Sequence, residues 1–587
     1  MKKKLVVVVI GLAFFLPNYL QAQVAISDIF YAQNYWLPDR EFDGRLEEFW
    51  TEIEASGVTH MRVGGIAYDY QNNEPVNTTH VWSTTDLCAT TTGIIDEIRS
   101  YGNPPIQPIL QVPIDITKTI AENCTSAVNL ITAVNVTNNK GIEFWQIGNE
   151  PNTSYAGVNN YNDNAVIANY IRQVSSAMKN VLGQSNIKII GPSFSYYHSN
   201  SYRSFLGSTL FGCSTCDITG VDGFGRYHID YIDYHTYPFQ SECYWVHGNT
   251  NCTGTNPPDR TDVVEYLAGS GNFKDNLQDI INYIPIGRIN NLKITITEAN
   301  ISYEQNTAES GVLDLGPGSY LGGQFWAELM GISMEKGVAL VAPWSVIEGT
   351  NQDPDPNVND WVSDIGYISS ETGQRRSSYW HYKMIADNFK GNYYSNPLNT
   401  TTFKAFSYVN TTSPANEIGV LVMNQTIQSS PRGSNPTSQT LGISFDNSTL
   451  TQTLKVKLNI TTPPTDPTYD CKITNETSML LIFDRTTGDL ISKKVYNLGD
   501  ALRPVDTGPE TWGLGSSSPI VNQDGFNSYY DAVYTNLVVT PASNISLSSP
   551  AVKIMRFSNT GTINGGGGSN TFTVNTGTEF TLLPTLT

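Results

Sequence analysis

The sequence predicts a (β/α)8 barrel followed by an all-β sandwich domain. From about residue 26 to residue 391, short apolar runs typical of buried parallel strands alternate with amphipathic helical runs, and this alternation occurs eight times. After Gly391 the helical periodicity disappears, and short alternating strands are separated by segments rich in Thr, Ser, Asn and Gly. A chain of 587 residues is also longer than a single domain usually is.

The first 22 residues have the pattern of a secretory signal. Three lysines at positions 2–4 precede the apolar run LVVVVIGLAFFL, and LQA before residue 23 fits a small-residue cleavage site. The apolar run is short for a membrane span, and no later stretch is long and apolar enough for one. We therefore expect a bacterial protein that is secreted or periplasmic after cleavage near Ala22, without a membrane span.

The barrel region divides into eight strand-like runs, each followed by a helical pattern. Glycines stand where several helical patterns stop, for example Gly57, Gly183 and Gly337. The expected strands are residues 26–33, 59–65, 106–113, a run that begins at Ile142, 187–192, 229–238, 292–302 and 339–346. The expected helices are residues 45–56, 93–101, 127–136, 165–182, 202–210, 262–283 with an interruption near 269–271, 320–336 and 377–390.

The remaining residues are expected to form the β-sandwich. Alternating runs include FKAFSYV, EIGVLVMN, LGISFD and LKVKLNI, and Thr486 to Asp489 form a turn signal between two further runs. No Pro- or Ser-rich linker precedes this region, and Phe389 to Tyr394 are too apolar for a solvated hinge. We therefore expect a signal at 1–22, a barrel at 23–391 and a β-sandwich at 392–587 that packs on the barrel. The β-sandwich shows no motif that carries chemistry.

Composition restricts the partners. The chain has 54 acidic and 34 basic residues, and its net charge of −20 leaves no basic footprint for nucleic acid. Aromatic residues are plentiful, with 32 Tyr, 22 Phe and 10 Trp, and their flat faces suit the stacking of sugar rings. The sequence does not indicate an oligomeric state.

The seven cysteines leave at least one unpaired within the chain. Cys213 and Cys216 are close in sequence, as are Cys243 and Cys252, and disulfides within each pair are expected in an oxidising compartment. The first pair is half of a zinc pattern, but no second pair or His cluster at ligand spacing accompanies it. We expect neither a metal nor a cofactor.

Residues that carry chemistry stand at the ends of the expected strands. In (β/α)8 barrels the carboxyl ends of the strands form one bowl that holds the active site. Glu150 ends the apolar run IEFWQIGNEPN, where a carboxylate is a poor choice for packing and a good one for contact with a substrate. The strand ends, in chain order, contribute Arg62, Asn149, Glu150, His235, Tyr237, Glu298, Asn300 and Trp344.

Two of these positions resemble a known group of enzymes. Asn149 and Glu150 after the fourth strand, together with Glu298 in ITEAN after the seventh, resemble the retaining glycoside hydrolases of clan A. The resemblance covers the barrel, and a barrel followed by a β-sandwich is a common arrangement in that clan. It implies that Glu150 is the general acid/base and Glu298 the nucleophile.

The same resemblance implies roles for the surrounding residues. Tyr237 and Arg62 match positions that orient the nucleophile, and Trp344 matches a tryptophan that forms the floor of the sugar site. We place His235 and Asn300 with these orienting residues. Three of them also have a purely structural interpretation: Arg62 as half of an ion pair, His235 as a core histidine and Trp344 as barrel packing.

The chemistry gives an independent reason for the two glutamates. Cleavage of a glycosidic bond with retention needs two carboxyl groups about 5–5.5 Å apart. One is an ionised nucleophile and the other is protonated, and the charge of Glu298 is expected to raise the pKa of Glu150. Asn149 is placed to hold the sugar 2-hydroxyl, a contact that strengthens in the transition state.

The substrate is less clearly indicated. Segments longer than about 15 residues without regular structure are usually functional, and three follow the expected strands at residues 66–91, 239–261 and 347–377. Their aromatic residues, among them Trp82, Trp245 and Trp361, are expected to line several subsites of a polysaccharide groove. This favours an internal cut in a polysaccharide over the trimming of a small glycoside.

The polymer is predicted from a coarser resemblance. The IGNEPN motif and the barrel-plus-sandwich plan look similar to the β-agarase and β-porphyranase enzymes and to the heparanase and β-glucuronidase enzymes. We expect an algal, sulfated or unsulfated, galactan such as agar, porphyran or carrageenan, with a uronic-acid-containing glycan or exo action as the alternative. A patch of Arg62, Arg226, His235 and His247 is expected to hold an anionic group.

Two other classes of function are considered. A catalytically inactive, carbohydrate-binding barrel would be favoured by the loss of either glutamate, and both are present. A lyase acting on uronate polysaccharides would need a base and a group that neutralises a carboxylate, rather than two glutamates on opposite strands. The sequence therefore favours a hydrolase.

Overall fold

The computed structural model describes the barrel region most fully and the C-terminal region in separate strands. The described residues are 24–35, 46–65, 87–89, 93–115, 118–152, 164–195, 217–239, 260–269, 271–301, 320–347, 365–368, 375–394, 403–410, 417–424, 438–448, 451–461, 477–484, 490–497, 552–555 and 579–582. The expected signal segment, the helix expected at 202–210 and the four cysteines that were expected to form disulfides lie outside these residues. The described cysteines, Cys88 and Cys124, are both free thiols.

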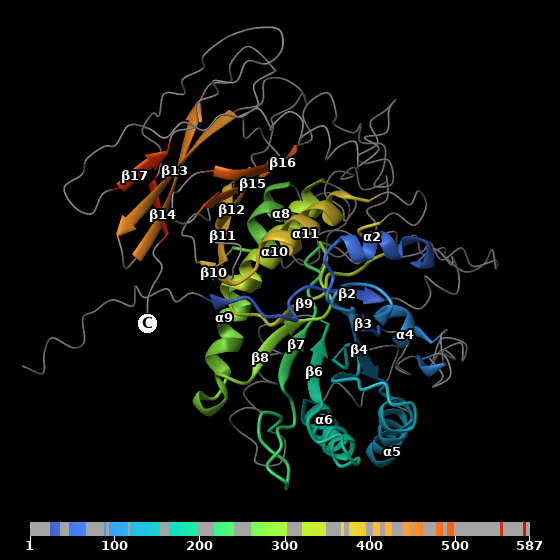
Figure 1. The fold of residues 1–587 in the computed structure, drawn as a ribbon. Helices are drawn as coiled ribbons and strands as arrows, with labels where there is room; N and C mark the ends of the chain where they lie inside the picture. Colours follow the sequence, from blue (N-terminus) through green and yellow to red (C-terminus); the bar gives the residue numbers. More distant parts are fainter. Residues whose placement is uncertain are drawn as a thin grey trace, which may run out of the picture.

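Eight parallel strands form a (β/α)8 barrel (Figure 1). Each strand pairs in parallel with its neighbours, and a bridge between Tyr31 and Val341 joins the first strand to the last. The strands have buried faces on both sides, which explains why they read as nearly continuous apolar runs in the sequence. They are β2 (Ala32–Tyr35), β3 (His60–Val63), β4 (Gln107–Val112), β5 (Phe144–Ile147), β6 (Lys188–Phe194), β7 (Tyr231–Tyr234), β8 (Lys293–Ile296) and β9 (Leu340–Val341).

The first barrel strand differs from its prediction. Residues 26–33 were the expected strand, but the barrel strand β2 begins at Ala32. A turn, in which the amide of Phe30 donates to the carbonyl of Ser27 at 3.0 Å, separates it from β1 (Val24–Ala25). β1 pairs with a strand of the β domain instead, so this one apolar stretch serves two sheets.

Within the described residues, helices follow the strands where the sequence predicts them, with one shifted start. The capping box of Thr119 and Glu122 starts the third helix at Ile120 instead of residue 127. The interruption predicted near 269–271 separates two helices, and Gly271 adopts a positive φ of 77° there. The helices are η1 (Leu46–Phe49), α2 (Trp50–Ala55), α4 (Ile94–Arg99), α5 (Ile120–Ile131) with η3 (Thr132–Thr137), α6 (Asn164–Lys179), α8 (Arg260–Tyr266), α9 (Phe273–Tyr283), η5 (Ile286–Arg288), α10 (Tyr320–Glu335) and α11 (Ser377–Asn388).

All described elements after Gly391 are strands, arranged in two antiparallel sheets. One sheet has the order β1-β10-β11-β12-β15-β16, and the other has the order β17-β13-β14-β18. The predicted hairpin is the antiparallel pair β15–β16. The strands are β10 (Asn392–Tyr394), β11 (Phe403–Asn410), β12 (Glu417–Asn424), β13 (Ser438–Ser448), β14 (Thr451–Thr461), β15 (Thr477–Asp484), β16 (Leu490–Asn497), β17 (Val552–Met555) and β18 (Glu579–Leu582).

The six-stranded sheet packs against α10 and α11 of the barrel (Figure 1). Lys404 of β11 forms an ion pair of 2.9 Å with Glu328 of α10, and both side chains are almost fully buried. The imidazole of His381 in α11 meets the hydroxyl of Ser478 in β15 at 2.7 Å. The two parts therefore share a buried interface. The exact boundary at residue 391 stays a prediction.

None of the helices in the described part of the chain combines the length and the apolar character that a membrane span needs.

Candidate active site

The structure brings the predicted strand-end residues together at the carboxyl end of the barrel. Arg62 lies in β3, Asn149 and Glu150 follow β5, His235 and Tyr237 follow β7, Glu298 and Asn300 follow β8, and Trp344 follows β9. Hydrogen bonds and close polar contacts connect the first six into one cluster. Trp82, Trp245 and Trp361 lie outside the described residues.

Two partners hold the carboxylate of Glu298. Arg62 donates from Nη1 to Oε1 at 2.6 Å, and the hydroxyl of Tyr237 donates to Oε2 at 2.9 Å. Each carboxylate oxygen therefore accepts a hydrogen bond from a different strand end. This arrangement binds the group as an anion and fixes the plane in which it points, as an oriented nucleophile requires.

Arg62 is fully buried, and its guanidinium donors all find acceptors. Nη1 donates to Asn34 at 3.1 Å as well as to Glu298, and Nη2 donates to Asn149 at 2.7 Å and to Gln111 at 3.4 Å. Nε donates to the side-chain oxygen of Gln146. A planar fork of five donors suits this set of acceptors and a lysine does not. Arg62 thus positions Asn149 and Glu298 relative to each other.

Glu150 has an unusual backbone conformation. Its φ is +44°, a left-handed value that a non-glycine residue adopts at a cost of order 1–3 kcal/mol and that gathers at functional sites. The amide of Glu150 donates to the carbonyl of Ser193 at 2.9 Å, and Ser193 itself has a φ of +54°. The preceding Gly148 also has a positive φ, of 73°. This sharp exit from β5 turns the Glu150 side chain towards the cluster, where it keeps 16% exposure.

The two glutamates lie close together in different surroundings. A carboxylate oxygen of Glu150 and one of Glu298 are within 4.8 Å of each other. Glu298 is bound by a cation and a phenol, whereas Oε1 of Glu150 meets Nδ1 of His235 at 2.8 Å. The short separation fits the roughly 5–5.5 Å of a retaining pair and not the roughly 6.5–9.5 Å of an inverting pair.

Nδ1 of His235 also lies near both glutamates, so three atoms of the kind that bind metals are within 4.8 Å of one another. Hydrogen bonds already account for their positions. Arg62 and Tyr237 hold the two oxygens of Glu298, and His235 holds Glu150. A cation among them would compete with the guanidinium of Arg62, so we interpret the cluster as an acid–base site.

His235 is a fully buried imidazole between charged groups. Burial lowers its pKa, and the charge of Glu298 acts against that shift more than any other group does. Its Nδ1 contacts Glu150, and its Nε2 lies 3.2 Å from the hydroxyl of Thr297. His235 therefore contacts the carboxyl group of Glu150 and is buried away from solvent, and its predicted orienting role stays a prediction.

Asn300 orients the chain that follows β9. It is fully buried, and its amide donates to the carbonyls of Trp344 and Ile365, while its oxygen accepts from the indole of Trp326 at 3.1 Å. These contacts fix the chain after β9 instead of reaching a substrate. Trp344 is 6% exposed, and its backbone carbonyl accepts a hydrogen bond from Asn300. This position agrees with a tryptophan that forms the floor of the site.

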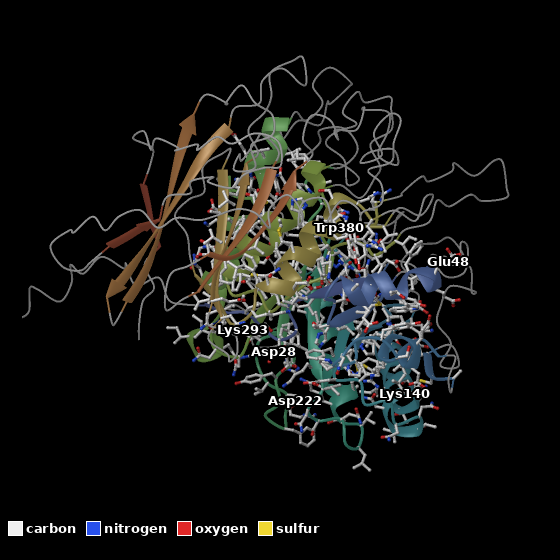
Figure 2. All side chains as sticks on the ribbon, turned by 45° about the horizontal axis from the view of Figure 1, so that its top comes forward. Asp28, Glu48, Lys140, Asp222, Lys293 and Trp380 are labelled. Atoms are coloured by element: carbon white, nitrogen blue, oxygen red, sulfur yellow. The ribbon has the colours of Figure 1, made fainter. Side chains whose placement is uncertain are left out.

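One residue of the patch that was predicted to hold an anionic group lies away from the site. Arg226 donates to Asp222 and to Asn180 before β7, and so lies at the amino end of the barrel strands, opposite the site. In Figure 2, the labelled Asp222 lies towards the lower edge with Lys140, which precedes β5. Arg62 and His235 are fully buried and engaged with the glutamates, and His247 lies outside the described residues. The prediction of an anion site around these residues is therefore wrong for Arg226.

A set of buried polar residues beneath the site was not predicted. They interrupt the apolar strand runs, as Gln146 does in FWQIGN and Asp233 does in YIDYHTY. These interruptions were the feature of the sequence from which the buried polar set could have been predicted. An uncompensated polar group inside a barrel costs free energy, so such residues point to partners. The set comprises Asn34, Gln111, Gln146, Ser193, Asp233 and Thr297.

Comparisons with known proteins give fold similarity only. No protein-family model matches the chain, and no curated protein matches its sequence. Similar solved structures include AbfB, a family 51 alpha-L-arabinofuranosidase from Bifidobacterium longum, with 13% identity, 72% of this chain and 88% of that chain covered, and a TM-score of 0.45. An alpha-L-arabinofuranosidase from Thermotoga maritima has 13% identity, 81% and 96% coverage and a TM-score of 0.46.

A third is a xyloglucanase of glycoside hydrolase family 44 from Paenibacillus polymyxa, with 13% identity, 78% and 97% coverage and a TM-score of 0.44. At these identities and TM-scores we draw no functional conclusion from the likeness. The function is inferred below from the geometry of the two glutamates.

Proposed function

We propose that this protein is a retaining glycoside hydrolase that acts by double displacement. The observation that carries the proposal is the pair Glu150 and Glu298. A carboxylate oxygen of each lies within 4.8 Å of the other, with a guanidinium and a phenol beside Glu298 and an imidazole beside Glu150. In the first step Glu298 attacks the anomeric carbon while Glu150 donates its proton to the leaving oxygen. In the second step Glu150 takes a proton from a water molecule whose oxygen attacks the anomeric carbon, and the bond from the sugar to Glu298 breaks.

Substitution of the two glutamates tests this assignment. Glu150→Gln and Glu298→Gln are each expected to fold and to lose at least about a thousandfold in turnover, because each removes a role that no neighbour fills. Azide is expected to restore turnover of Glu298→Ala partly, because it can occupy the space of the lost carboxylate. NMR of the first product should show the anomeric configuration of the substrate. Inverted product, or activity near that of the wild type in either Gln variant, would contradict the proposal.

The proposed substrate is a polysaccharide cut internally, with a red-algal galactan as the first candidate. The support is in the sequence: the long aromatic-rich segments after three strands and the resemblance of IGNEPN to agarases and porphyranases. Because Arg226 lies at the opposite end of the barrel from the site, it does not support the binding of a sulfate group there. A uronic-acid-containing glycan is the second candidate, and we propose that the chain is exported to reach either polymer.

A panel of polymers with product sizing tests the substrate. Agarose, porphyran and carrageenan are compared with a uronic-acid-containing glycan and with arabinan, xylan and xyloglucan. Mixed oligosaccharides from a galactan at early times are the expected result, because an endo enzyme cuts within the chain. Release of uronides alone, with every galactan left intact, would overturn the first candidate. Release of monosaccharide alone would overturn endo action.

A further inference from the structure

Beneath the two glutamates, buried hydrogen bonds connect β5, β7 and β8. The carboxyl group of Asp233 in β7 accepts at Oδ1 from the amide of Thr297 at 3.0 Å and from the hydroxyl of Thr295 at 2.9 Å. At Oδ2 it accepts from the hydroxyl of Thr297 at 2.6 Å and from Gln146 at 3.2 Å. Burial raises the pKa of Asp233, and the neighbouring His235, followed by hydrogen bonds from Ser193 and Thr297, acts against that rise. Four donors aimed at two oxygens are the surroundings of a carboxylate anion.

The hydroxyl of Thr297 has one proton and three neighbours. The contact of 2.6 Å with Asp233 has the length of a charge-assisted bond, so the proton lies there. The remaining contacts, with Gln146 at 3.0 Å and with Nε2 of His235 at 3.2 Å, then meet lone pairs of the threonine oxygen. Nε2 of His235 must therefore supply its own proton to form a hydrogen bond.

The consequence reaches Glu150. Four charged or titratable groups face the imidazole: Glu150 at 2.8 Å and Glu298 at 3.5 Å from Nδ1, Asp233 at 4.0 Å from Nε2, and Arg62. Burial keeps the imidazole neutral by lowering its pKa, so one nitrogen has no proton. With the proton on Nε2, the bare nitrogen is Nδ1, and a contact of 2.8 Å with Oε1 of Glu150 requires a proton on the carboxyl group.

We propose that Asp233 and Thr297 are positioning residues, which hold His235 as the Nε2–H tautomer so that its bare Nδ1 keeps Glu150 protonated in the resting enzyme. The inference rests on the proposed function, in which Glu150 is the acid. The Glu150 proton leaves for the glycosidic oxygen as the C–O bond breaks and the bond from the sugar to Glu298 forms. The Glu150 carboxylate then faces the lone pair of Nδ1 of His235. The repulsion between them favours the transfer of a proton from the attacking water to Glu150.

The tautomer can be measured without a substrate. The full-length protein, labelled with 15N-histidine, contains seven histidines, and the His235 signals are assigned by their loss in His235→Gln. At pH 7 the wild type should show the proton on Nε2. Thr297→Val removes the acceptor and should move the proton to Nδ1, whereas Thr297→Ser should keep the wild-type tautomer.

Two further variants protect the test. Asp233→Asn should also move the proton, because an amide donor frees the Thr297 proton for Nε2. Thr295→Val is the matched control. Thr295 is equally buried in β8, and its hydroxyl faces Asp233 and the carbonyl of Ile232, so this variant should leave the tautomer of His235 unchanged. A wild-type spectrum with the proton on Nδ1 would overturn the proposal, as would an unchanged tautomer in Thr297→Val or in Asp233→Asn.

Activity gives a second readout. In Thr297→Val an Nδ1–H group would favour ionised Glu150, so the alkaline limb of the kcat/KM profile should move to lower pH by about one unit. The acidic limb should stay, and Thr297→Ser should restore the profile. An unmoved alkaline limb contradicts the proposal. The Nε2–H tautomer in a protein that cleaves no glycan would instead refute the proposed function and leave the hydrogen-bond assignment intact.

Discussion

At the scale of single residues, Arg62 organises the site more than either glutamate does. It is fully buried, yet all five of its N–H donors have acceptors, which come from β2, β4, β5 and the ends of β5 and β8. A buried charge is tolerated only when it is paired and hydrogen-bonded, and the ion pair with Glu298 meets that condition. The same guanidinium reaches Asn149, the neighbour of Glu150, and so links the two strand ends that carry the glutamates.

Arg62→Lys tests this organising role. An ammonium supplies one charge and three donors, so it cannot serve the acceptors on Asn34, Gln146, Asn149 and Glu298 together. We expect a loss of kcat of at least about a hundredfold and a loss of stability of about 3–5 kcal/mol, as when one partner of a buried pair is disturbed. Steady-state kinetics and urea unfolding measure the two effects.

Lys404→Arg is the matched control for Arg62→Lys. It exchanges the same two residue types in a buried ion pair, with Glu328, outside the active site. It should affect stability without the loss of kcat. Equal kinetic losses in both variants would show that Arg62 acts through stability alone.

Site residues could be predicted from the sequence where they stand at the end of an expected barrel strand. Glu150, Glu298, Tyr237 and Arg62 could be selected because carboxyl ends of barrel strands meet in one bowl. The role of Asn300 could not, because its partners Trp344 and Ile365 are distant in sequence and only the fold brings them near. The positions of buried polar residues such as Asp233 were visible in the sequence, but their partners were not.

At the scale of elements, helix α10 shows how small residues allow close approach. A Cβ atom at Gly331 would lie 2.3–2.5 Å from ring atoms of Phe406 in β11. The ring therefore packs directly on the helix backbone, and real Cβ atoms do not come so close. The sequence marks this helix by periodicity and its C-terminal glycine. The packing of Phe406 on Gly331 depends on which face meets the sheet, and periodicity alone does not reveal that.

Gly331→Ala is expected to force β11 away from α10. Overpacking of this kind costs about 1–3 kcal/mol, so the thermal midpoint should fall by several degrees. Gly287→Ala is the control, because a Cβ there meets nothing within 4 Å. Calorimetry of both variants measures the difference. A midpoint for Gly331→Ala equal to that of the control would mean that the sheet adapts without cost.

Element boundaries were predicted where a local signal exists. The glycines at the ends of α6 and α10 and the break between α8 and α9 follow from backbone preference. The early start of α5 also has a local sequence signal, the capping box of Thr119 and Glu122. It was missed because the apolar periodicity begins later. The division of the first apolar stretch between two sheets has no local signal, because it depends on strands near residues 341 and 392.

At the scale of the whole molecule, the barrel and the β domain meet through buried polar groups. These are the ion pair of Lys404 with Glu328 and the contact of the His381 imidazole with Ser478. Nδ1 of His381 lies 2.8 Å from the carbonyl of Ser377, so it carries the proton. Nε2 then accepts from the hydroxyl of Ser478, whose oxygen also accepts from Gln324 at 3.2 Å. Burial lowers the pKa of His381 to about 4. A proton on Nε2 would break the donor–acceptor order that joins α11 to β15.

This pKa makes the stability of the molecule depend on pH. Above pH 6.5 His381 is neutral in both states, so it adds no pH dependence. Between pH 6.5 and about 4 the unfolded chain binds a proton that the folded one excludes, so stability falls as the pH falls. For one fully buried histidine the difference amounts to about 3 kcal/mol. His60 and His228, with pKa values also lowered to about 4 by burial, add to the same trend.

The His381→Gln variant separates the interface from the other histidines, because glutamine offers a donor and an acceptor but cannot gain a charge. Protease at pH 4.5 is expected to release the β domain from the wild type faster than at pH 7.5, and this acceleration should disappear in His381→Gln. His60→Gln is the matched control. The imidazole of His60 is buried and its pKa is lowered in the same way, but His60 lies at the start of the barrel strand β3, away from the six-stranded sheet of the β domain. The control should lose part of the pH dependence of urea unfolding and keep the rapid release at pH 4.5. If the two variants released the β domain equally fast at that pH, the coupling would be a property of the whole fold and not of the contact between His381 and Ser478.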